Sequence, residues 1–79
     1  MIYEKVKELL ARQFETDPAG IGPGTHIVND LGADSLDAVE LIISLEEEFN
    51  ILISEAAAKD MFTTEQIALY IEKAKADLN

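Results

Sequence analysis

The chain has 79 residues, a mass of 8.7 kDa and a formal net charge of −10, so it has room for one folded domain, which we assign to residues 1–79. Such an acidic protein repels phosphate groups, which excludes nucleic acids and anionic membrane surfaces as direct partners and favours proteins with basic surfaces. The absence of cysteine excludes disulfide bonds and thiolate metal sites. Without a signal-peptide pattern or a run of about 18 apolar residues, we expect a cytoplasmic protein that does not insert into membranes.

The first half of the chain is divided between a helix and one long connection. Apolar residues recur at steps of three and four and predict a helix over about residues 2–15, with an apolar stripe of Ile2, Val6, Leu9, Leu10 and Phe14. All four glycines and both prolines lie between Pro18 and Gly32, which predicts the longest loop there. We expect four apolar residues to pack beneath this loop: Ile21, Ile27, Val28 and Leu31.

Three further helices are expected after the loop. Asp34 and Ser35 begin a second helix that reaches about Phe49, and Ser54-Glu55 begins a short third one. Thr63 and Gln66 have capping-box spacing and begin the last helix, which we expect to bury Ile67, Tyr70, Ile71, Ala74 and Leu78. The short run Ile51-Leu52-Ile53 is interpreted as an apolar plug in a loop. The predicted fold class is therefore all-α, a small four-helix bundle with a long first loop and a short third helix.

The second helix has two apolar faces. The core face is expected to contain Ala38, Leu41, Ile42, Leu45 and Phe49. A second stripe of Leu36, Val39 and Ile43 falls on a different arc, bordered by Glu40 and Glu47 on one side and by Glu46 on the other. These three residues either pack against the third helix or the long loop, or form a partly exposed surface onto which the acids steer a basic partner.

Charge segregation favours the exposed surface. Residues 13–58 contain ten carboxylates and neither Lys nor Arg. Uncompensated charge of one sign lowers folding stability through self-repulsion, so it is more often kept for binding than for the fold. The same segregation predicts that salt or divalent cations stabilise the domain.

Asp34 and Ser35 are adjacent candidates for the same helix cap. Serine is a preferred cap residue, so in one interpretation Ser35 itself caps the helix and has no further role. If Asp34 caps the helix instead, the Ser35 hydroxyl lies free at the positive end of the helix, where a phosphate ester would be favoured. The two residues alone leave both possibilities open.

The surrounding residues carry a family resemblance. The twelve-residue segment DLGADSLDAVEL at 30–41 closely resembles the prosthetic-group attachment motif of bacterial acyl carrier proteins, and LEEEFN at 45–50 is similar to the rest of that family's second helix. Chain length, acidity, the long first loop and the Thr63-Thr64 start of the last helix extend the resemblance over nearly the whole chain.

The resemblance implies that a phosphopantetheinyl transferase attaches 4'-phosphopantetheine from coenzyme A to Ser35, next to Asp34. The thiol of this arm would carry acyl groups as thioesters, and the acyl chain would tuck between the helices and swing out into each partner enzyme. The family's partner-binding positions match Leu36, Asp37, Val39, Glu40, Ile43, Glu46 and Glu47. The protein would then be a monomeric carrier, not an enzyme, which presents acyl groups to basic-surfaced enzymes of fatty-acid biosynthesis.

Differences from the family concentrate near the third helix. Leu52 stands where a polar or acidic residue is common, Ser54 replaces a common proline, and residues 56–58 are alanines where acids are frequent. They raise the alternative of a carrier dedicated to a specialised pathway, such as polyketide, lipid or amino-acyl transfer.

Other function classes find less support in the residues. A non-covalent acidic adaptor would need the carboxylates but not Ser35. An enzyme is disfavoured because His26, a loop residue, is the one histidine and no cysteine could serve as a nucleophile, so we assign no catalytic residue. Asp30, Asp34, Asp37 and Glu40 lack the spacing of a calcium loop, so we assign no metal ligand.

Overall fold

The structure, a computed structural model, describes residues 2–77, apart from the side chain of Asp77. Four α-helices follow one another: α1 (Ile2–Gln13), α2 (Ser35–Phe49), α3 (Glu55–Ala58) and α4 (Thr64–Asp77). The described residues contain no strand, which confirms the predicted all-α bundle with its long first loop and short third helix. Leu78, predicted to be buried, lies outside the described residues. No described helix is long and apolar enough to cross a membrane.

The first helix ends earlier than predicted. Glu15 adopts a left-handed backbone conformation with φ 52°, and the Thr16 N–H donates to the Ala11 carbonyl at 2.9 Å. A left-handed residue after the last turn closes a helix, so α1 ends at Gln13 and the predicted end at residue 15 is two residues too late. A 3₁₀ turn that the sequence did not predict, η1 (Pro18–Gly20), follows in the loop and is capped by the side chain of Asp17.

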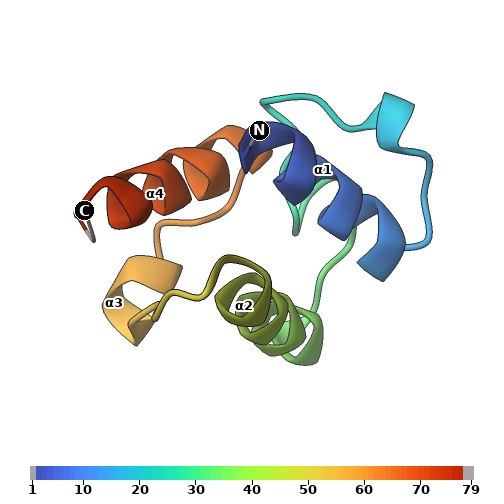
Figure 1. Ribbon diagram of the computed structural model, residues 1–79. Coiled ribbons are helices and arrows are strands. Elements are labelled where there is room, and N and C mark those ends of the chain that lie inside the picture. The colour runs from blue at the N-terminus through green and yellow to red at the C-terminus, as the bar shows by residue number, and fades with distance from the viewer. Residues whose placement is uncertain (1, 78–79) are drawn as a thin grey trace.

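The core lies between α1, α2 and α4. In Figure 1, α1 and α4 lie at the top of the view, with α2 and α3 below them. The fully buried side chains come from all three long helices: Val6 and Leu10 of α1, Leu41 and Leu45 of α2, and Ile67 and Ile71 of α4. Ala38, Ile42, Tyr70 and Ala74 are half-buried, and the buried Ala68 was not predicted. The helical periodicity therefore identified most of the core.

Two loop predictions were partly wrong. Ile21 and Ile27 are buried beneath the long loop as expected and Leu31 is half-buried, but Val28 is 44% exposed. In the apolar plug, Ile51 and Ile53 are buried whereas Leu52 is 89% exposed. Successive side chains of an extended segment point to opposite sides, so a three-residue run buries its ends and exposes its middle.

The long loop is fastened to the beginning of α4. The Ile27 N–H donates to the Phe62 carbonyl at 2.8 Å, and the Thr64 N–H donates to the Thr25 carbonyl at 3.2 Å. The predicted capping box is confirmed, because the Thr63 hydroxyl accepts the Gln66 N–H at 3.1 Å and the Gln66 side-chain carbonyl accepts the Thr63 N–H at 3.1 Å. The segment that leads into α2 is thus held by the start of the last helix.

Candidate functional site

The beginning of α2 is capped by Asp34. One oxygen of its side chain accepts the Asp37 N–H at 2.9 Å, and the Asp37 carboxylate accepts the Asp34 N–H at 3.1 Å. Asp34 has an extended backbone, and Ser35 is the first residue of the helix. The possibility that Ser35 is the cap is therefore wrong.

Capping by Asp34 leaves the Ser35 hydroxyl available. The residue is exposed, and within residues 2–77 no group forms a hydrogen bond with its hydroxyl. The amides of the first helical turn have no partner within a helix and carry the positive end of the helix dipole. An accessible, uncommitted hydroxyl therefore lies where a negatively charged substituent is stabilised.

A tight loop delivers the chain to this position. The His26 carbonyl accepts the Asp30 and Leu31 amides at 2.8 and 3.2 Å, and the Ala33 N–H donates to the Ile27 carbonyl at 2.9 Å. Gly32 has φ +74°, a conformation that a residue with a side chain adopts only with strain. These bonds determine the direction in which the chain enters α2.

The end of α1 braces the first turn of α2. The side-chain amide of Gln13 donates to the Asp37 carbonyl at 2.8 Å. The sequence analysis did not identify Gln13, because a glutamine at a helix end forms no recognisable motif. The bond connects residues 24 positions apart, so only the packing of α1 against α2 creates it.

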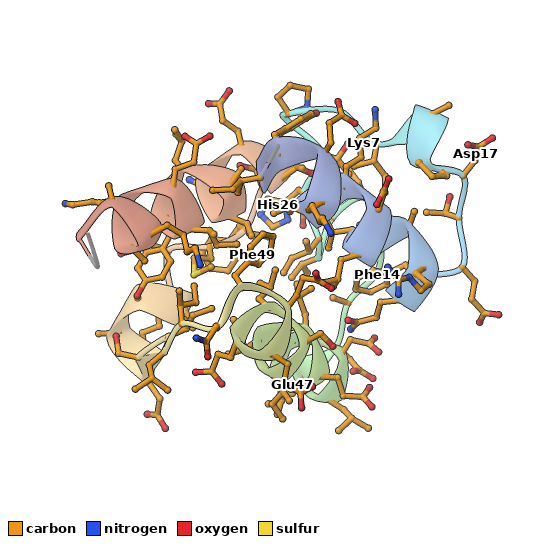
Figure 2. All side chains as sticks on the ribbon, viewed as in Figure 1. Lys7, Phe14, Asp17, His26, Glu47 and Phe49 are labelled. Carbon is orange, nitrogen blue, oxygen red and sulfur yellow. The ribbon has the colours of Figure 1, made fainter. Side chains whose placement is uncertain are left out.

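The second apolar stripe of α2 is a surface. Leu36, Val39 and Ile43 are 65%, 55% and 49% exposed, so they do not pack against α3 or the long loop. Glu40 and Glu47, predicted to border this stripe, are exposed as well. Figure 2 labels Glu47 on α2 at the lower edge of the view, away from α4. We call Leu36, Val39 and Ile43 the outer stripe.

The remaining acids of α2 have partners within the fold. The carboxylate of Glu46 is half-buried and accepts the Ile53 N–H at 2.8 Å, which fastens the connection between α2 and α3. Glu48 forms an ion pair with Lys5 of α1 at 3.6 Å. Asp37 is half-buried and completes the capping box. The acids that face solvent without a partner within residues 2–77 therefore include Glu40 and Glu47.

Two hollows flank α2. An open groove of about 700 Å³ lies along the surface between α1 and α2 and is lined by Leu9, Arg12, Gln13, Glu40, Ser44, Glu47 and Glu48. On the other side is a smaller, more enclosed cavity of about 90 Å³. Its ten lining side chains are all apolar: Ile27, Val28, Ala38, Leu41, Ile42, Leu45, Ala58, Met61, Phe62 and Ile67. We call it the apolar pocket.

The apolar pocket lies close to Ser35 along the helix. Ala38, one of its lining residues, donates its N–H to the Asp34 carbonyl at 3.0 Å and so lies one turn after the cap. An apolar chain attached near the start of α2 would find shelter from water there. The site thus combines a free hydroxyl, an exposed outer stripe and an enclosed apolar space.

This chain is similar to known proteins in its sequence and in its fold. A family model described as the phosphopantetheine attachment site matches residues 4–71. The acyl carrier protein of Solidesulfovibrio magneticus is 42% identical over 76 residues, which cover 96% of this chain and 97% of that protein. A solved structure of a candidate acyl carrier protein from Mycobacterium tuberculosis superimposes with a TM-score of 0.81 at 32% identity and full coverage of both chains.

Proposed function

The chain belongs to the acyl carrier protein family, whose cofactor is covalent 4'-phosphopantetheine, and we propose that Ser35 is the residue that bears this cofactor. The exposed and uncommitted Ser35 hydroxyl beside the Asp34 cap is the observation that supports the assignment. Ser44 is half-buried and Ser54 caps α3 through its hydroxyl, so neither presents an equivalent group.

The residues around Ser35 fit a phosphate ester. The Asp34 side chain accepts the Asp37 N–H. The other amides of the first turn and the helix dipole then stabilise the negative charge of the phosphate. When bound, the group supplies a terminal thiol that carries an acyl group as a thioester. The apolar pocket then excludes water from the acyl chain, because all its lining side chains are apolar.

The outer stripe is the proposed docking surface for the phosphopantetheinyl transferase and the enzymes that use the acyl group. Exposed apolar residues bury area against a partner, while Glu40 and Glu47 attract its basic groups. Leu36, Val39 and Ile43 form the apolar contact in this proposal. Asp34, Asp37 and Glu46 act mainly by holding the helix start and the following loop in place.

The proposed role is to carry acyl groups in fatty-acid biosynthesis, as a cytoplasmic monomer without catalytic activity of its own. A carrier dedicated to a specialised pathway is the second candidate. The observation that favours it is the exposure of Leu52, at a position where this family often has a polar residue. An added apolar contact of this kind suits a partner that other carriers do not have.

Intact-mass spectrometry after incubation with coenzyme A and a broad-specificity phosphopantetheinyl transferase tests the assignment. The native protein and the Ser44→Ala control should gain one phosphopantetheine, and Ser35→Ala should gain none while its circular dichroism remains helical. Modification of Ser35→Ala would contradict the assignment. If an active transferase modified none of the folded proteins, the covalent role would be wrong and the acidic adaptor would become the better hypothesis.

A further inference from the structure

The side chain of His26 is built into the loop before α2. Its Nδ1 accepts the backbone N–H groups of Val28 and Asn29 at 3.2 and 3.1 Å. Its own backbone N–H donates to the Asp30 carboxylate at 2.8 Å. The two bonds to Nδ1 hold the imidazole ring in one orientation and the third holds the His26 backbone, so His26 is a structural part of the loop rather than a free surface side chain.

The His26 ring lies flat against the ring of Phe62. The two ring centroids are 5.4 Å apart and the planes differ by 8°, an offset-stacked arrangement that aromatic pairs favour. The Ile27 N–H donates to the Phe62 carbonyl at 2.8 Å beside the stack, so the two segments are also paired through their backbones. Figure 2 labels His26 near the beginning of α4, in agreement with this pairing.

The residues that His26 contacts form part of the wall of the apolar pocket. Phe62 lines the pocket and is 40% exposed, and Val28, which donates its N–H to His26, lines it as well. The other side of this wall is solvent. Phe62 and Val28 are therefore parts of the wall that can move outward without displacing the core, and the stack with His26 opposes that movement of Phe62.

The pocket is small for an acyl chain. An engineered apolar cavity of about 150 Å³ binds benzene, so the 90 Å³ of this pocket correspond to roughly four carbon atoms. A longer chain must enlarge the space. The fully buried lining residues Leu41, Leu45 and Ile67 are close-packed. Phe62 and Val28 are the exposed residues of the wall, and displacement of the larger Phe62 side chain frees the more space.

We propose that His26 and Phe62 form a gate that sets the length of the acyl chain enclosed by this carrier. With the rings stacked, the pocket encloses short acyl chains of about four carbons, and longer chains enter only when Phe62 leaves His26. His26 acts as a positioning residue for Phe62. This inference rests on the proposed function, because the chain is carried by the arm on Ser35.

Protection of the thioester tests the gate. The transferase loads four proteins from butyryl- or octanoyl-coenzyme A: the native protein, His26→Asn, Phe62→Ala and Ile71→Val. Cleavage of the thioester by hydroxylamine is then followed by intact-mass spectrometry. Protection is defined as the cleavage rate of the free acyl-coenzyme A divided by the cleavage rate of the same acyl group on the protein. Asparagine retains a short side-chain acceptor for the loop amides but has no ring. Ile71 is fully buried and does not line the pocket, so its variant controls for lowered stability.

The native protein should protect the butyryl group several-fold more than the octanoyl group. His26→Asn and Phe62→Ala should raise octanoyl protection at least threefold without raising butyryl protection, and Ile71→Val should keep the native ratio. The gate proposal is wrong if His26→Asn keeps the native ratio of octanoyl to butyryl protection, including the case in which it lowers the protection of both chains equally. It is also wrong if the native protein protects the octanoyl group better than the butyryl group. Failure of loading would instead refute the covalent role of Ser35, and loading without protection of either chain would refute enclosure and the gate together.

Discussion

The two faces of α2 use the same kinds of side chain for opposite purposes. Leu41, Leu45 and Phe49 are buried against α1 and α4, whereas Leu36, Val39 and Ile43 face solvent. Leucine occurs on both faces, so hydrophobicity alone does not separate core from surface. Burial of the inner face stabilises the fold, while the outer face remains exposed and forms the docking surface in the proposed function.

The carboxylates of α2 divide in the same way. Glu46 accepts a backbone amide from the next loop and Glu48 pairs with Lys5, so these charges have partners within the fold. Glu40 and Glu47 are exposed and border the outer stripe. The sequence analysis treated these carboxylates as one acidic surface. In the packed structure some of them have partners within the fold, and others remain exposed for contact with another protein.

The largest expected effect is on stability and comes from the inner face. Leu45→Ala should lower the free energy of unfolding by about 2–5 kcal/mol, because it removes a fully buried side chain and leaves a cavity. Ile43→Ala, two residues away on the outer stripe, should lower it by less than about 1 kcal/mol. Urea denaturation of both variants measures the difference. Equal losses would mean that the two faces are not distinct.

Reversal of an outer charge should act on association rather than on the fold. Glu47→Lys should slow binding to a basic partner such as the transferase by roughly tenfold at low salt, since steering charges act chiefly on the association rate. The effect should shrink as salt screens the charges. Glu72→Lys, an exposed residue of α4, gives the same change in net charge away from α2 and should bind almost as the native protein does. Stopped-flow binding at two salt concentrations decides, and a salt-independent effect would exclude steering.

The smallest expected effect distinguishes the two adjacent residues at the start of α2. Asp34→Ala removes the cap and should lower the free energy of unfolding by about 1 kcal/mol. Ser35→Ala should lower it less, because no hydrogen bond to the Ser35 hydroxyl is found within residues 2–77. Thermal unfolding of the unmodified variants measures both values. The opposite order would assign the cap to Ser35.

Much of this architecture could be predicted from local patterns. Apolar residues spaced three or four positions apart predicted α1, α2 and α4, and Thr63 with Gln66 predicted the start of α4 correctly. Hydrophobic periodicity and capping depend on residues a few positions apart, which is why a single sequence reveals them. The segment at 30–41 also carried enough of the family's motif to indicate the family, in agreement with the comparisons.

The cap at Asp34, the loop residues and the pocket needed the structure. Asp34 and Ser35 are both suitable caps, and only the backbone angles distinguish them, with Asp34 extended and Ser35 helical. Gln13 contacts the first turn of α2 across 24 residues, and His26 stacks on Phe62 across a longer separation. No local pattern encodes such pairs, because they arise from the way in which separate segments meet.

Sequence by itself determined that this is an acidic helical protein with a family motif around Ser35 and two apolar stripes on its second helix. Tertiary structure alone decided which stripe is exposed, which acids are committed to the fold, and that an apolar pocket lies one turn from Ser35 with His26 and Phe62 beside it. The physical reason is that composition and helical period depend on neighbours along the chain. Burial, by contrast, depends on which surfaces are removed from water when distant helices pack.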